Sequence, residues 1–304
     1  MKALLPTPEK VGYVSGYQDR SRHDTPVGSV LRWDHRLLRL RLMFTERSLS
    51  PLLSTVRAEY APSATVLDVG TDFETLPPAV AEDLGLLADS IDPASYPAEW
   101  LPDTSPALLQ QYAGSEFTIG MPGDGTVVWT RQTEPPTVLL KQRAEGTPDP
   151  FLQFLVAEAF VKLDCGVPEH FLPFFGGEYR DLDAAVALAG NDVYQIAAAL
   201  FDGWVGLQTR EVFTSWADDP EFEPLYEAWV DAGQRLEGRL GDLSRAVAHN
   251  EMRFAEATEY ACSAIKHDLD IPTPFGALDT AAYREHGADY AVEWAEKTFA
   301  ELRE

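Results

Sequence analysis

The sequence FLQFLVAEAFVKL, at residues 151–163, separates two parts of the chain that differ in pattern. A capping region with proline near the first turn precedes it at residues 147–150, and Gly166 follows it. These signals predict one core helix over residues 151–163. Short strand-like segments come before this helix and almost only helical patterns come after it, so this stretch decides the fold class.

The part before this helix, residues 43–146, has a mixed pattern. Ser50-Pro51 begins a short helix that runs to about Tyr60, and Thr65–Val69 is typical of a strand. Another helix begins at Pro77-Pro78 and continues through Leu87. Three further strands are predicted to form a small antiparallel sheet, and they cover residues 117–119, 126–130 and 138–142.

The part after it, residues 147–304, is predicted to be helical almost throughout. A long helix begins at Asn191 or Asp192 and continues towards Phe213. Further helices are predicted at residues 221–238, at 243–267, and from Thr280 to the C-terminus. The fold class is therefore α+β, with a small antiparallel or mixed β portion followed by a predominantly α-helical C-terminal portion. We expect residues 43–304 to form one domain.

Charge divides the chain at another point. The 304 residues carry 49 Asp and Glu against 24 Lys and Arg, a formal charge of −25. Residues 1–42 hold eight basic and four acidic side chains, so they carry +4 and the rest carries −29. We favour the interpretation that this basic extension lies upstream of a true start at Met43. The alternative is a basic arm, in which arginines and leucines of residues 29–44 bind a surface.

The acids are spread along the chain, and lysine is scarce, with 6 Lys against 18 Arg. Such a composition suits molar salt, in which the Debye length falls to about 3 Å and like charges no longer repel. In this respect the chain resembles uncharacterised protein families of halophilic archaea. The acid excess opposes binding to nucleic acid and to anionic membranes, because both need basic side chains.

Cysteine content and hydropathy indicate the compartment. Cys165 and Cys262 are the only cysteines, so there is no disulfide framework and a reducing cytoplasm is expected. The N-terminus lacks the apolar segment of a secretory signal. The most apolar stretch, residues 193–207, is too short to cross a bilayer.

A strand followed by a helix and a later acidic helix resembles the zincin metallopeptidases, over residues 117–210. In that family an edge strand precedes a helix with the motif HExxH, whose histidines bind zinc and whose glutamate activates water. The resemblance implies that Glu158 is the general base and Asp202 the third, acidic ligand. Ala157 and Val161 occupy the two histidine positions and cannot bind a metal. It therefore implies an inactivated or repurposed scaffold, without a metal.

Glu158 also has a purely structural interpretation. It stands four residues before Lys162, the favourable order for an ion pair on a helix. A single acid in so apolar a helix is costly to bury unless it is paired. His170 is a third candidate catalytic residue, if its loop reaches a pocket near Glu158 and Asp202. The alternative role of His170 is to cap or pack a helix.

A second constellation lies on the predicted helix at residues 243–267. His249, Arg253, Glu256 and Tyr260 recur at steps of three and four residues, so they share one face. They are candidate ligand-binding residues if that face is buried. A mixed-charge face of this kind is otherwise solvated.

The chain lacks a Gly-x-Ser-x-Gly elbow, a phosphate-binding GxxxxGK[ST] loop and a CxxC pair. We therefore favour a cytosolic, non-catalytic binding or scaffold protein adapted to high salt. Such a role requires no cofactor and implies a partner that the sequence does not name. The alternatives are a repurposed zincin-like metallohydrolase scaffold and an adaptor acting through the basic N-terminal arm.

The salt interpretation predicts that dialysis from molar to low KCl abolishes the helical circular dichroism signal. Unscreened carboxylates then repel one another across the whole surface and destabilise the compact state. The measurement is the thermal unfolding midpoint over a series of KCl concentrations. A midpoint that is the same in low and molar KCl would exclude this interpretation.

Overall fold

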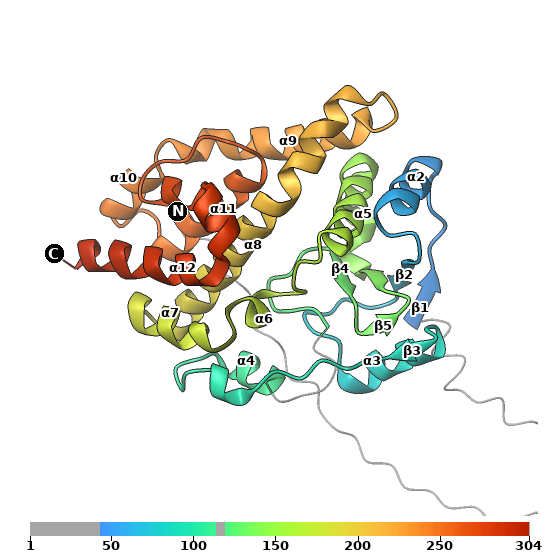
Figure 1. Ribbon diagram of the computed structural model, residues 1–304, viewed down its shortest axis with the longest axis horizontal. Helices are drawn as coiled ribbons and strands as arrows, with labels where there is room; N and C mark the ends of the chain where they lie inside the picture. Colours follow the sequence, from blue (N-terminus) through green and yellow to red (C-terminus); the bar gives the residue numbers. More distant parts are fainter. Residues whose placement is uncertain (1–42, 114–118, 304) are drawn as a thin grey trace, which may run out of the picture.

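The computed structural model describes residues 43–113 and 119–303. In Figure 1 the strands gather at one side of the molecule, and most of the later helices gather at the other. The protein thus has the predicted α+β class, with its sheet in the N-terminal part and helices in the C-terminal part.

The main sheet has four strands, in the order β1, β2, β6, β4. They are β1 (Phe44–Glu46), β2 (Thr65–Val69), β4 (Val127–Thr130) and β6 (Thr137–Leu140). Strand β6 is antiparallel to β4 and parallel to β2, while β1 is antiparallel to β2. The sheet is therefore mixed. Its parallel pair, β2 and β6, is joined by a long crossover connection, because parallel strands cannot be joined by a hairpin.

The predicted strands were partly right. Strand β2 has the predicted bounds, and β4 and β6 form the predicted antiparallel pair. Of the predicted strand at residues 117–119, only Ile119 lies within the described residues, and it is not in a strand. Three short strands were not predicted: β1 at the edge of the main sheet, and β3 (Ser90–Ile91) and β5 (Thr133–Glu134), which pair in a separate sheet.

The main sheet contributes buried side chains to a hydrophobic cluster on each of its faces. Side chains alternate along its inner strands, so each inner strand supplies both clusters. On β6, Val138 and Leu140 belong to the large hydrophobic cluster that continues into the helices. Leu139 points the other way, into a smaller cluster that includes Phe73 and Leu84. The large cluster joins the sheet to the helical part, so the two parts share one core.

Among the described residues before residue 149, the chain forms three α-helices. Helix α2 (Pro51–Tyr60) begins as predicted, with the hydroxyl of Ser50 accepting the N–H of Leu53 at 3.2 Å. The helix predicted over residues 77–87 is shorter, with α3 (Pro78–Asp83) followed by a single 3₁₀ turn at Leu84–Leu86. Helix α4 (Ala107–Tyr112) was not predicted.

Helix α5 (Asp149–Asp164) covers the predicted stretch and packs against α2 and β4. Two short helices follow, α6 (Phe171–Phe175) and α7 (Tyr179–Val186). Helix α8 (Gly190–Ser215) is the longest, and α9 (Glu223–Leu240) packs against both α5 and α8. Within the described residues, no helix has the length and hydropathy needed to cross a membrane.

The single helix predicted over residues 243–267 is wrong. The chain forms α10 (Leu243–Ala248) and α11 (Phe254–Lys266), with a break between them. Asn250 in this break has φ 57°, a left-handed conformation that an α-helix cannot accommodate.

The last helix, α12 (Ala281–Leu302), begins as predicted at the cap Thr280. Short 3₁₀ turns occupy other connections, at Ala98–Trp100, Gln142–Gly146, Gly176–Glu178, Trp216–Asp218 and Phe275–Leu278.

Glycines let α8 and α11 approach closely along their length. A Cβ built on Gly203 lies 3.2 Å from the side chain of Cys262, and one built on Gly206 lies 2.8 Å from the Cα of Lys266. The second distance is too short for a real Cβ contact, so Gly206 determines how near the backbone of Lys266 can come to α8. This approach positions the Lys266 side chain.

We expect Gly206→Ala to destabilise the protein by about 1–3 kcal/mol, because the added methyl group forces α11 away from α8. Chemical unfolding in molar KCl measures this. Gly238→Ala is the matched control, since it adds the same methyl group to α9, where a Cβ meets no atom within 4 Å. The control should be neutral or stabilising by up to about 1 kcal/mol. Equal effects of the two substitutions would contradict this account of the contact.

Candidate functional site

Glu158 lies in the middle of α5 and is buried, with 4% of its surface exposed. The predicted pair with Lys162 is present, with the ammonium nitrogen 3.4 Å from the carboxylate. A second ammonium group, that of Lys266 at the end of α11, makes a closer ion pair with the same oxygen. The interior acid is thus bound by two lysines, of which the sequence predicted one.

The two lysines determine the charge of Glu158. Burial by itself would raise its pKa, but the Lys162 and Lys266 ammonium groups outweigh burial and lower the pKa to about 2. In the same way, burial would lower the pKa of Lys266, and the carboxylates of Glu158 and Asp202 raise it above its usual value. Glu158 and Lys266 are therefore both charged at neutral pH.

Asp202, the other acid of the zincin resemblance, lies on α8 and is exposed. Its negative charge raises the pKa of Lys266, the lysine that binds Glu158 from α11. The strand before α5 also differs from the resemblance, because β6 lies between β2 and β4 and is not an edge strand. In the described part of the chain, no group of three His, Cys, Asp or Glu side chains is placed to hold a metal ion.

His170 caps α6. Its Nδ1 accepts the N–H of Leu172 at 3.2 Å, and its ring packs edge-on against Tyr96 with 4.9 Å between the centroids. Burial lowers the pKa of His170 to about 3, so the ring is neutral at physiological pH. Its Nε2 is buried without a hydrogen-bond partner. The structure therefore gives His170 the capping and packing role.

The four candidate ligand-binding residues do not share a helix face, because the helix that would align them is broken. His249 is exposed at the end of α10, and Arg253 pairs with Asp192 at 2.6 Å before α11 begins. Glu256 and Tyr260 remain together on α11, where the Tyr260 hydroxyl accepts a hydrogen bond from Arg239 of α9. Arg253 and Tyr260 thus connect helices to one another.

Lys141 is a buried ionisable group that the sequence reasoning missed. It follows β6 directly and has only 1% of its surface exposed. Its ammonium nitrogen has no hydrogen-bond partner and lies 4.9 Å from the centroid of the Phe73 ring. Burial lowers the pKa of Lys141, while the nearby charge of Asp124 opposes this shift. Burial also raises the pKa of Asp124, to about 6.

Scarcity of lysine is the signal that could have identified this region. Residues 43–304 contain four lysines, and three of them are buried or half-buried. These three are Lys141, Lys162 and Lys266. Lys162 and Lys266 bind Glu158, and the charge of Lys141 acts on Asp124.

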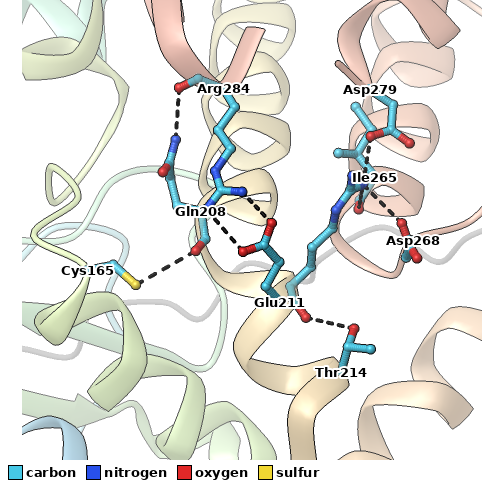
Figure 2. A network of polar contacts seen from close by, with 9 residues as sticks. Cys165, Gln208, Glu211, Thr214, Ile265, Asp268, Asp279 and Arg284 are labelled. Atoms are coloured by element: carbon cyan, nitrogen blue, oxygen red, sulfur yellow. Dashed lines mark hydrogen bonds and ion pairs between the residues drawn. The ribbon is translucent and has the colours of Figure 1, made fainter. Parts of the chain in front are cut away.

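Figure 2 shows a second polar network, in which α8 binds the end of α11 and the start of α12. The guanidinium of Arg210 donates to Asp279 at 2.6 Å and lies 3.3 Å from the carboxylate of Asp268. The next residue, Glu211, accepts from Arg284 with both of its carboxylate oxygens. These contacts fix the arrangement of three helices.

The arrangement defines an α+β protein with a buried ion pair that connects α5 to α11. The chain belongs to a family of unknown function (DUF7089), which it matches over residues 43–302. The match begins at the residue where the charge of the sequence changes sign, and the N-terminal extension lies outside both the match and the described residues. No curated protein and no solved structure matches the chain.

The double ion pair makes a prediction about stability. We expect Glu158→Gln to cost about 3–5 kcal/mol at neutral pH, because it leaves two ammonium groups without their buried counter-charge. The pKa of Glu158 is lower in the folded chain, so its contribution is present above the unfolded value of 4.5 and is lost as the pH falls towards about 2. The difference between the variant and the wild type should therefore shrink on acidification.

Chemical unfolding in molar KCl at several pH values measures this difference. The control is Glu293→Gln, which makes the same change in an exposed ion pair with Lys297, also four residues on. It should have little effect, since solvent and salt screen such a pair. Unchanged stability of Glu158→Gln would mean that the acid acts only as a surface group.

Proposed function

We propose that this chain is a non-catalytic binding or scaffold protein of a salt-rich cytosol. The observation that carries the proposal is the double ion pair at Glu158. A general base needs a carboxylate that takes up a proton near the working pH. A pKa of about 2 instead keeps Glu158 ionised and bound to its two lysines. The interior acid most similar to a catalytic group thus serves to cross-link helices.

The distribution of charge supports adaptation to high salt. The acids on the outer face of α12 are exposed, and they are Glu285, Asp289, Glu293 and Glu296. The opposite face of the same helix buries Tyr283 and Trp294 in the core. The surface of α12 is therefore dense in carboxylates. Most lysines of residues 43–304, in contrast, are buried or half-buried. Such a surface is best tolerated where salt screens it.

Two alternatives have less support. A repurposed zincin scaffold would need an edge strand before α5, whereas β6 is an inner strand. It would also need Glu158 to be available to a substrate or water, whereas two lysines bind it. An adaptor that acts through a basic N-terminal arm depends on residues 1–42, which lie outside the described residues.

Incubation of the protein with a metabolite extract in molar KCl, followed by mass spectrometry, tests the proposal. We expect no metabolite to be consumed beyond one equivalent per chain, because a binding protein retains its ligand without turnover. Consumption of several equivalents would contradict the proposal. If Glu158→Gln abolished that turnover and Gly206→Ala did not, the zincin alternative would gain support. The second variant is the control for lost stability.

A further inference from the structure

A pocket of about 300 Å³ opens at the surface where α12 meets α8 and the 3₁₀ turn before α7. Two aromatic side chains and several carboxylates share its lining. The lining residues are Phe174, Glu178, Trp204, Glu285, His286, Gly287, Ala288 and Asp289. The volume is at the lower end of the range for small-molecule sites, enough for a compact ligand.

Gly287 gives the pocket its shape. It has φ 51° and ψ −119°, a conformation outside the helical region, so α12 is kinked there. A Cβ at this position would lie 3.1 Å from the Phe174 ring and would strain the backbone. The kink brings the backbone of α12 close to the aromatic rings and places Asp289 near Glu178.

The aromatic wall is rigid. The rings of Phe174 and Trp204 lie 4.9 Å apart between centroids, and the indole N–H of Trp204 donates to the carbonyl of Arg284 at 3.2 Å. This hydrogen bond uses the polar edge of the indole. A tryptophan face is the aromatic surface that attracts organic cations most strongly.

The carboxylates of the pocket lack a matching positive charge. Glu178 and Asp289 hydrogen-bond each other, an arrangement that needs a shared proton. Burial raises the pKa of Glu178, and the nearby charges of Asp289 and Asp181 raise it further, to about 7. Glu285 adds another acid to the lining, and His286 is its one basic side chain. Elsewhere in the described chain, close carboxylates such as Asp72 and Glu74 pair with an arginine.

We propose that this pocket binds an alkylammonium group, which the Glu178–Asp289 pair neutralises and the Trp204 ring contacts. The inference rests on the proposed binding function and adds the chemical class of its ligand. The same chemistry could come from a free amine or from the lysine side chain of a peptide. A bound cation replaces the proton that the two carboxyl groups share, so cation and proton compete for the pair.

The test is an NMR titration of the folded protein with tetramethylammonium chloride in molar KCl, at pH 6 and pH 8. Because a carboxyl group with a pKa near 7 is mostly protonated at the lower pH, we expect about tenfold tighter binding at pH 8. Potassium ions compete with tetramethylammonium for the pocket throughout the titration. Binding in molar KCl therefore also shows that the pocket selects the organic cation. Parallel titrations with methylammonium and with Nα-acetyl-lysine methylamide compare a free amine with a peptide lysine.

Variants assign the binding to the pocket. Glu178→Gln should weaken binding at least tenfold and abolish its pH dependence, and Trp204→Leu should weaken it at both pH values. Glu293→Gln removes the same charge from α12 outside the pocket and should leave both properties unchanged. Circular dichroism in the same buffer confirms that each variant is folded. If Glu178→Gln did not fold, Asp289→Asn would serve in its place, since it also removes one acid of the pair.

The inference fails if the wild type does not bind tetramethylammonium, or if it binds equally at pH 6 and pH 8. It also fails if Glu178→Gln and Glu293→Gln bind alike. None of these results bears on turnover, so they leave the proposed non-catalytic function standing. Conversely, turnover of a metabolite in the extract would overturn that function whether or not the pocket binds an ammonium ion.

Discussion

A buried carboxylate bound by two lysines is the constraint on which the arrangement of the helices depends. Glu158 cannot be removed from water at low cost unless positive charges accompany it. One of them comes from the same helix, but the other, Lys266, comes from α11 and reaches Glu158 only if α11 lies close to α8. Gly206 permits that approach. The position of α11 relative to α5 is therefore tied to the pairing of this charge, within the hydrophobic core that joins the two parts.

The protein combines two opposite uses of charge. Its surface is dense in acids, whereas three of the four lysines in residues 43–304 lie inward, next to Glu158 and Asp124. A lysine on the surface of such a protein would gain little, because salt screens its interactions. Inside, the same side chain is screened much less, and its ion pairs hold the layers together. The interior and the surface pocket thus differ in kind: the interior acids are neutralised by lysines, while the Glu178–Asp289 pair is not.

Much of the fold could be predicted because it depends on local patterns. The cap Ser50, the strand Thr65–Val69 and the apolar stretch of α5 each have signals within a few residues. The break between α10 and α11 was missed because the hydrophobic pattern continues across it, while Asn250 adopts a left-handed conformation that only the packed structure requires. The candidate residues from His249 to Tyr260 lost their common face for that reason.

By itself, the sequence determined the α+β class, the helix that divides the chain, and the pair of Glu158 with Lys162, because these depend on neighbours along the chain. The tertiary structure alone decided that β2 and β6 are parallel, that Lys266 completes the ion pair, and that the His170 ring packs against Tyr96. It also decided that a kink at Gly287 places two acids beside an aromatic wall. Contacts between residues about a hundred positions apart leave no periodic signal in one sequence, so only the packed chain could show them.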